Sequence, residues 1–96
     1  MDIVKLNTDS RALLESVADR LPADTVAYYR SLGAAGEWAE LVDGLAASLV
    51  RRKVVVTIAE YQQLADLLGH FPAGQEGYVF LRDPQGVLAQ LAVDPS

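Results

Sequence analysis

Apolar residues between positions 38 and 49 recur with the spacing of an α-helix that buries one face. Residues three and four positions apart share a helical face, so this pattern requires another element to cover it. Acidic residues lie off this apolar stripe, at Glu37, Glu40 and Asp43. The segment therefore predicts a helix from about Gly36 to Arg51. The stripe itself is formed by Trp38, Leu41, Val42, Leu45, Ala46 and Leu49.

Capping residues on either side predict three further helices. Asp9 or Ser10 can cap a first helix over residues 11–21, because short polar side chains satisfy the free N–H groups of a first turn. A second helix, capped at position 24 or 25, is expected to run through Leu32 and to stop at Gly33. Its adjacent residues Tyr28 and Tyr29 cannot both face inward, and Tyr28 is expected to point outward.

A capping box marks the start of the fourth helix. The β-branched run of residues 54–56 disfavours continued helix. Thr57 and Glu60 then have the spacing at which each side chain satisfies a backbone N–H of the other. The helix is expected to run to about Leu68, and Gly69 to end it.

The segment after Gly69 has a different composition. Residues 78–81 have the aromatic and β-branched content of a strand, and residues 83–86 fit a type I turn. Residues 87–93 can form a returning strand or a short helix, and we favour a β-hairpin over about 77–94. The expected fold class is mainly α: a small four-helix domain with its helical part at about residues 10–69, followed by the hairpin, in one domain spanning residues 1–96.

Composition excludes several classes of function. The chain has 96 residues, no cysteine and a net charge of −5. The negative charge argues against nucleic acid as a partner, since phosphate binding needs clustered cations. No signal peptide or membrane span is evident, so we expect a cytoplasmic protein that does not bind a membrane.

Enzymatic motifs are lacking. His70 is the one histidine, and it follows a helix-ending glycine rather than lying in a catalytic motif. No serine lies in a nucleophile turn, and the spacing of the carboxylates fits neither zinc nor calcium. We therefore expect no catalytic residues, no metal and no cofactor, and we interpret His70 as structural.

Carboxylates on two predicted helices are the candidate binding residues. Glu37, Glu40 and Asp43 cluster on one side of the third helix, and Glu15 and Asp19 form a similar pair on the first. Such residues usually form a solvated helix face. The functional alternative is an acidic patch that, together with Tyr28, contacts a partner protein.

The order of these features resembles a known family. The residues concerned are Tyr28-Tyr29-Arg30-Ser31-Leu32, Gly36-Glu37-Trp38-Ala39-Glu40-Leu41-Val42-Asp43-Gly44-Leu45-Ala46, Val56-Thr57-Ile58-Ala59-Glu60-Tyr61 and Leu64-Ala65-Asp66-Leu67-Leu68. In this order they resemble the small helical immunity proteins of bacterial polymorphic toxin and contact-dependent growth inhibition systems, the Maf-type immunity family. The resemblance covers residues 11–68, and residues 71–96 lie beyond it.

The resemblance implies a stoichiometric inhibitor rather than an enzyme. Such an immunity protein would bind and neutralise the C-terminal domain of a cognate toxin. Basic toxins, nucleases among them, suit an acidic partner. The same composition also fits an acidic helical adaptor or regulatory module with a partner other than a toxin, and this alternative stays open from the sequence.

Overall fold

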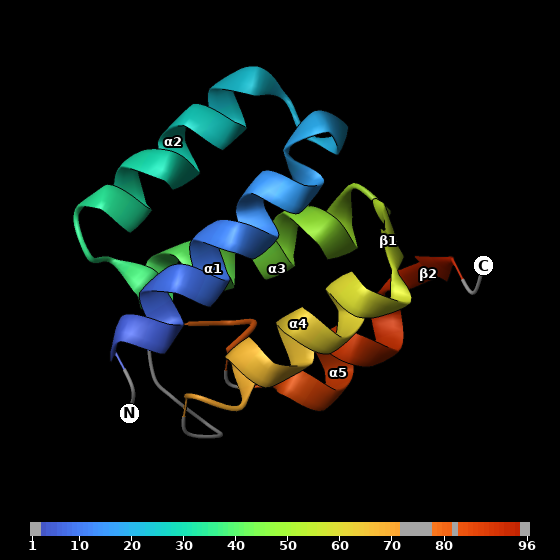
Figure 1. Ribbon diagram of the computed structural model, residues 1–96. Helices are drawn as coiled ribbons and strands as arrows, with labels where there is room; N and C mark the ends of the chain where they lie inside the picture. Colours follow the sequence, from blue (N-terminus) through green and yellow to red (C-terminus); the bar gives the residue numbers. More distant parts are fainter. Residues whose placement is uncertain (1–2, 72–77, 82, 95–96) are drawn as a thin grey trace.

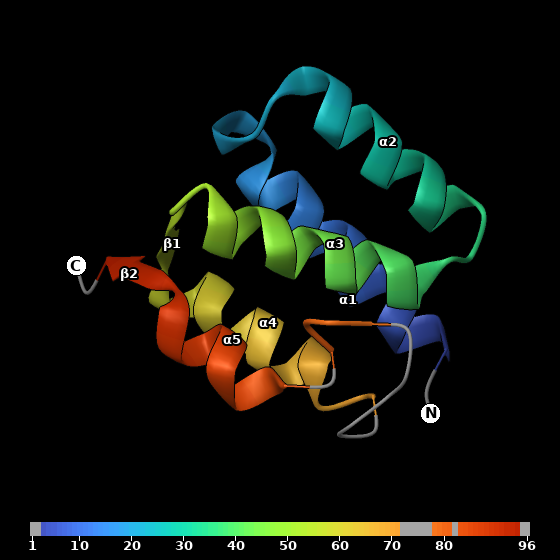
Figure 2. The ribbon, with the colours of Figure 1, turned by 180° about the vertical axis from the view of Figure 1, so that it is seen from behind.

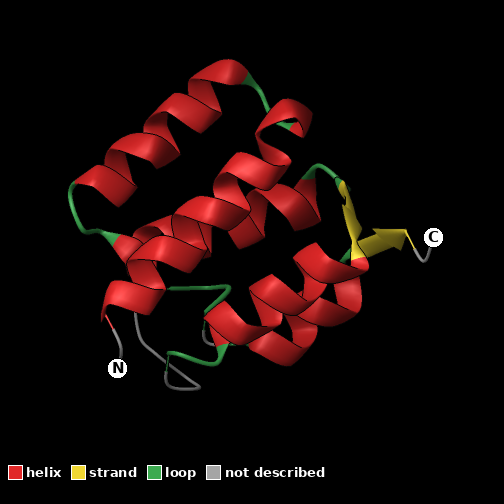
Figure 3. Cartoon of the chain, viewed as in Figure 1, coloured by secondary structure: helices red, strands yellow, loops and turns green. Residues whose placement is uncertain are grey.

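Helices make up most of the computed structural model, which describes residues 3–71, 78–81 and 83–94. This confirms the mainly α class (Figure 3). The described residues form five α-helices, one more than expected. The elements are α1 (Ile3–Val17), the 3₁₀ turn η1 (Ala18–Arg20), α2 (Ala23–Ala34), α3 (Trp38–Arg51), β1 (Val55–Thr57), α4 (Ile58–Leu68), α5 (Pro84–Gln90) and β2 (Ala92–Asp94).

Helix α3 is the centre of the fold. It lies between α2 on one side and the pair α4 and α5 on the other, while α1 covers one of its faces (Figures 1 and 2). The predicted apolar stripe is the side that these helices cover, since Leu41, Val42 and Leu45 are completely buried. Trp38, at the head of the stripe, packs against the core and donates its indole N–H to Asn7 Oδ1 at 3.0 Å. Sequence periodicity therefore identified the helix around which the others pack.

Helix α1 begins earlier than the capping residues suggested. It starts at Ile3 rather than at Arg11, and its last expected residues form η1. The buried stripe of this helix already begins at Leu6, which is 1% exposed. Asp9 does not cap a helix, because it forms an ion pair with Lys5 at 2.6 Å within α1. Burial of the earlier apolar residues thus places the start of the helix before the polar residues that could have capped it.

The other helix boundaries agree more closely with the sequence. Helix α2 continues past Gly33 to Ala34, and the chain reverses at Gly36, whose φ of +75° is a conformation that glycine adopts without strain. Helix α4 has the predicted capping box and is followed by Gly69 as its C-cap. These helix ends are determined by residues that are close in the sequence, and for that reason they can be predicted from it.

The predicted C-terminal hairpin is wrong for the described residues. Asp83 caps α5 by accepting a hydrogen bond from the Gly86 N–H at 3.1 Å, and Pro84 follows at the first helical position. The strand β2 then pairs with β1, in parallel register with Val56 opposite Val93. A parallel pair needs a long crossover connection, which here includes α4 and α5. Residues 77 and 82 of the predicted hairpin lie outside the described residues.

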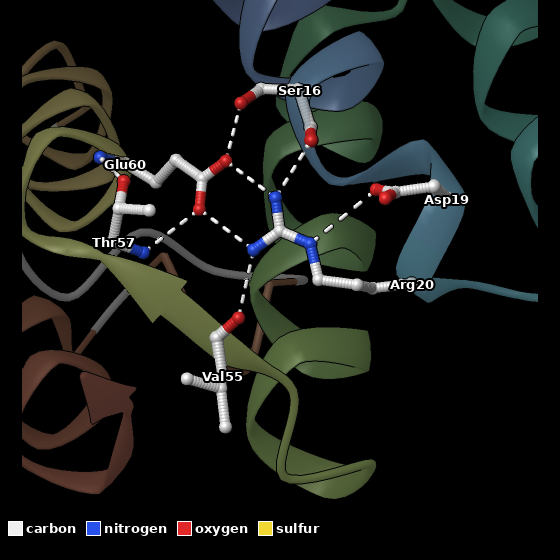
Figure 4. A network of polar contacts seen from close by, with 6 residues as sticks. All are labelled: Ser16, Asp19, Arg20, Val55, Thr57 and Glu60. Carbon is white, nitrogen blue, oxygen red and sulfur yellow. Dashed lines mark hydrogen bonds and ion pairs between the residues drawn. The ribbon is translucent and has the colours of Figure 1, made fainter. Parts of the chain in front are cut away.

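A network around Glu60 joins the N-terminal helices to β1 and α4 (Figure 4). The Glu60 carboxylate is buried and accepts two hydrogen bonds from the Arg20 guanidinium, at 2.6 and 2.8 Å. It also accepts from the Ser16 hydroxyl and from the Thr57 backbone N–H. Arg20 in turn donates to the Val55 carbonyl at 2.8 Å. The Arg20 guanidinium is the main reason that the pKa of Glu60 is lowered to about 2.

Replacing Glu60 with glutamine should destabilise the fold by about 2 kcal/mol at pH 7, because the half-buried Arg20 guanidinium loses its buried counter-ion and keeps only the exposed Asp19 carboxylate. Folding lowers the pKa of Glu60, so its contribution is complete above the ordinary carboxyl value of 4.5 and is lost as the pH falls towards 2. Urea unfolding of Glu60→Gln and of the native chain between pH 7 and pH 3 should show the difference shrinking with acid. Glu15→Gln makes the same chemical change in an exposed ion pair and should change stability little. Equal effects of the two substitutions would contradict the role assigned to Glu60.

Candidate protein-binding site

The described residues do not assemble a metal-binding centre. No group of three or more His, Asp or Glu side chains among them could hold a metal ion. The Nε2 atom of His70 is buried and has no hydrogen-bond partner within this part of the chain. Ser16 contacts a carboxylate, but that carboxylate belongs to Glu60 and is bound by Arg20. A Glu60 with a pKa of about 2 is a poor base at neutral pH.

Tyr29 fixes the packing of α2 on α3. Its ring is buried, at 8% exposure, and its hydroxyl donates to the Gly44 carbonyl at 2.8 Å. The carbonyl can only accept, so the Ser48 hydroxyl, 2.7 Å away, donates to the Tyr29 oxygen. This pair of hydrogen bonds holds the hydroxyl end of the Tyr29 ring against α3.

Gly44 makes this close approach of the two helices possible. A Cβ atom at position 44 would lie 2.9 Å from ring carbon Cε1 of Tyr29, closer than van der Waals contact allows. Glycine inside a helix normally costs stability. At this position its small size permits the ring to contact the backbone of α3.

Asp43 connects α3 to residues 78–81, which we call the C-terminal strap. One carboxylate oxygen, Oδ1, accepts hydrogen bonds from the backbone N–H groups of Phe80 and Leu81, at 2.9 and 3.0 Å. Leu81 is completely buried, and the Arg51 guanidinium lies over the Phe80 ring at 5.1 Å from its centre. Figure 2 shows the strap, in orange, passing beside α3. Asp43 is therefore a structural residue as well as a surface charge.

These contacts leave an open groove of about 550 Å³ between α2, α3 and the strap. The residues that line the groove are Tyr28, Tyr29, Leu32, Glu40, Asp43, Gly44 and Tyr78. Aromatic rings and carboxylates thus lie around one hollow. The described lining residues include no cation. Such a site can bind a cationic group, through ion pairs with the carboxylates and cation–π contacts with the aromatic rings.

Most other carboxylates of the described chain already have ionic partners. Glu15 is bound by Arg30 through two hydrogen bonds, at 2.6 and 2.8 Å. Asp9 and Asp66 both lie within 4 Å of the Lys5 ammonium, beside a second groove of about 410 Å³ between α1 and α4. Glu37 and Glu40, by contrast, are exposed and form no ion pair within the described residues. The first turn of α3 and the residue before it thus carry two exposed carboxylates without an ionic partner among the described residues.

The predicted binding residues therefore divide into two groups. Tyr28, Glu40 and Asp43 meet at the groove, and Glu37 precedes the same helix. Tyr28 points outward as expected, with 57% of its surface exposed. The other two predicted residues do not line the groove. Glu15 pairs with Arg30 on the α1–α2 surface, and Asp19 lies in η1 beside Arg20.

Sequence reasoning missed the groove residues Tyr29 and Tyr78. Tyr29 was expected only to face inward, and Tyr78 was assigned to a strand. Two adjacent tyrosines in a helix predict one inward and one outward ring. They do not predict that both rings line the same groove, where the ring centres lie 5.8 Å apart. Tyr78 reaches the site through the strap, which no local pattern predicted.

We expect Gly44→Ala to destabilise the protein by about 1–2 kcal/mol, because overpacking against Tyr29 outweighs the gain in helix propensity. For a chain of this size, that loss corresponds to a fall of roughly 5–15 °C in the melting temperature. Gly33→Ala is the control: a Cβ atom there would meet the flexible Arg11 side chain at 3.2 Å. It should leave the melting temperature unchanged or raise it. A Gly44→Ala variant as stable as the native chain would show that the Tyr29 ring is not held against α3.

None of the described helices is both long enough and apolar enough to span a membrane. Comparison with known proteins gave no match: no protein-family model fits the sequence, and no curated protein and no solved structure is significantly similar to it.

Proposed function

We propose that this chain is an immunity protein, which binds the toxin domain of a bacterial polymorphic toxin system and neutralises it in a stoichiometric complex. The order of helix starts that resembles the Maf-type immunity family supports this proposal. The observation that carries it is the placement of Glu40, which lacks an ionic partner within the described chain, beside an exposed tyrosine in an open groove. Glu37, also without an ionic partner among the described residues, precedes the same helix.

This combination suits binding to a basic protein surface. Tyrosine supplies a large contact area at little cost in side-chain entropy and is enriched at protein interfaces. Carboxylates that are not already paired can form new ion pairs with a partner without first breaking old ones. The net charge of −5 also favours rapid association with a basic toxin domain.

The function is tested by co-expression with the toxin domain encoded next to this gene. Cells that produce the toxin domain alone should stop growing, and this protein should restore growth and co-purify with the toxin at a fixed ratio. A neighbour that is harmless, or a toxin that this protein does not neutralise, would overturn the proposal. The acidic adaptor would then be the remaining interpretation.

A charge variant should weaken the complex without affecting the fold. We expect Glu37→Gln with Glu40→Gln to reduce toxin affinity about tenfold or more, since both residues offer carboxylates that have no partner in the described chain. Gln62→Lys with Gln63→Lys changes the net charge by the same amount on exposed positions of α4 and is the matched control. Isothermal titration calorimetry at two salt concentrations should show a loss of affinity and of salt dependence only for the first variant. Equal losses of affinity for both variants would show that the net charge of the protein determines toxin binding and that the two carboxylates at the start of α3 make no specific contact.

A further inference from the structure

We infer that the α2–α3 groove is a receptor for a single arginine side chain of the partner protein. The inference rests on the proposed function in that the partner is a protein with a basic surface, and it adds the chemical group that the groove binds.

The walls of the groove are suited to a flat cation. The Tyr28 and Tyr29 rings lie 5.8 Å apart and are tilted by 45° to one another, and Tyr78 also lines the hollow. The Tyr29 ring is held in place by its hydrogen bonds to α3. Aromatic faces attract guanidinium groups, which also stack on them because they are planar.

Two carboxylates in the groove retain acceptor oxygens. Asp43 uses Oδ1 for the backbone N–H groups of the strap, while its Oδ2 atom has no hydrogen-bond partner within the described residues. Glu40, also at the groove, makes no hydrogen bond or ion pair in this part of the chain. The position of Asp43 is set by the strap, so one acceptor is already in place before a ligand binds.

These two features favour arginine over lysine. A guanidinium can donate to two carboxylates from its edge while its face contacts an aromatic ring, whereas an ammonium is a compact and strongly hydrated charge. The protein makes both kinds of contact within its own fold. Arg20 binds Glu60 through two nitrogens, and Arg51 lies over the ring of Phe80.

No internal arginine of the described chain fills this role in the groove. The nearest arginine in sequence to the tyrosine pair, Arg30, is bound to Glu15 on the surface between α1 and α2. Arg51, the cationic residue of α3, lies at the opposite end of that helix from Glu40. The groove therefore offers negative charge that the described fold leaves uncompensated.

The inference is tested with capped amino acids and the ¹⁵N-labelled full chain. Nα-acetyl-arginine methylamide should shift the amide signals of residues around positions 28, 40, 43 and 78 in a saturable titration. The lysine derivative should bind about fivefold more weakly, because it loses the stacking contact. The citrulline derivative has the shape of arginine without its charge and should produce no saturable shift. Equal binding of arginine and citrulline, shifts elsewhere on the surface, or no shift with any probe would overturn the inference.

Two variants assign the binding to the groove carboxylates. Asp43→Asn keeps one oxygen to accept from the strap and removes the charge, and Glu40→Gln removes the other charge. Each should weaken arginine binding about threefold or more, whereas Glu15→Gln on the α1–α2 surface should not change it. Unchanged binding in both groove variants would contradict the assignment.

The outcome is separable from that of the toxin experiment. A toxin complex that forms while no arginine probe binds would refute the arginine receptor and leave the proposed function intact. Saturable arginine binding by a protein that neutralises no toxin would refute the function and keep the receptor.

Discussion

The buried carboxylate of Glu60 is the interaction on which the arrangement of the two halves of the fold depends. It closes the capping box at the start of α4 and binds the guanidinium of Arg20 at the end of the N-terminal segment. Arg20 reaches the backbone of β1 as well. A single charged group therefore sets both the first turn of a helix and the position of the elements that precede it in the chain. The apolar core supplies most of the driving force, but it does not by itself specify this orientation.

The parts of the fold that could be predicted are those determined by nearby residues. The stripe from Trp38 to Leu49 and the capping box of Thr57 and Glu60 act within one or two helical turns, and both occur in the structure as predicted. The start of α1 was missed because burial against other helices, and not a cap, decides it. The C-terminal hairpin was wrong because the partner of β2 is β1, which lies before α4 in the sequence. Strand composition indicates a strand but not the distant segment with which it pairs.

In the candidate site, too, features set by nearby residues could be predicted, and features set by contacts between distant elements could not. Spacing along one helix predicted that Glu40 and Asp43 lie together, and both line the groove, while Glu37 precedes the helix and does not. The outward direction of Tyr28 followed from its neighbour. The groove itself depends on the contact between Tyr29 and the backbone at Gly44, which is a property of two helices in one geometry. The neutralisation of Glu15 by Arg30 is likewise a contact between elements. Sequence could suggest which residues carry charge, but only the folded chain shows which of those charges are still available.

The residues that line the groove differ in how many contacts they make with the rest of the fold. Tyr29, Asp43 and Gly44 hold the helices and the strap together. The side chains of Tyr28 and Glu40 are exposed and make no hydrogen bond within the described residues. Substitutions at these last two positions alter the surface without removing a side-chain hydrogen bond of the described fold. The surface chemistry of the groove can therefore be changed at Tyr28 and Glu40 while the hydrogen bonds that join α2, α3 and the strap are kept.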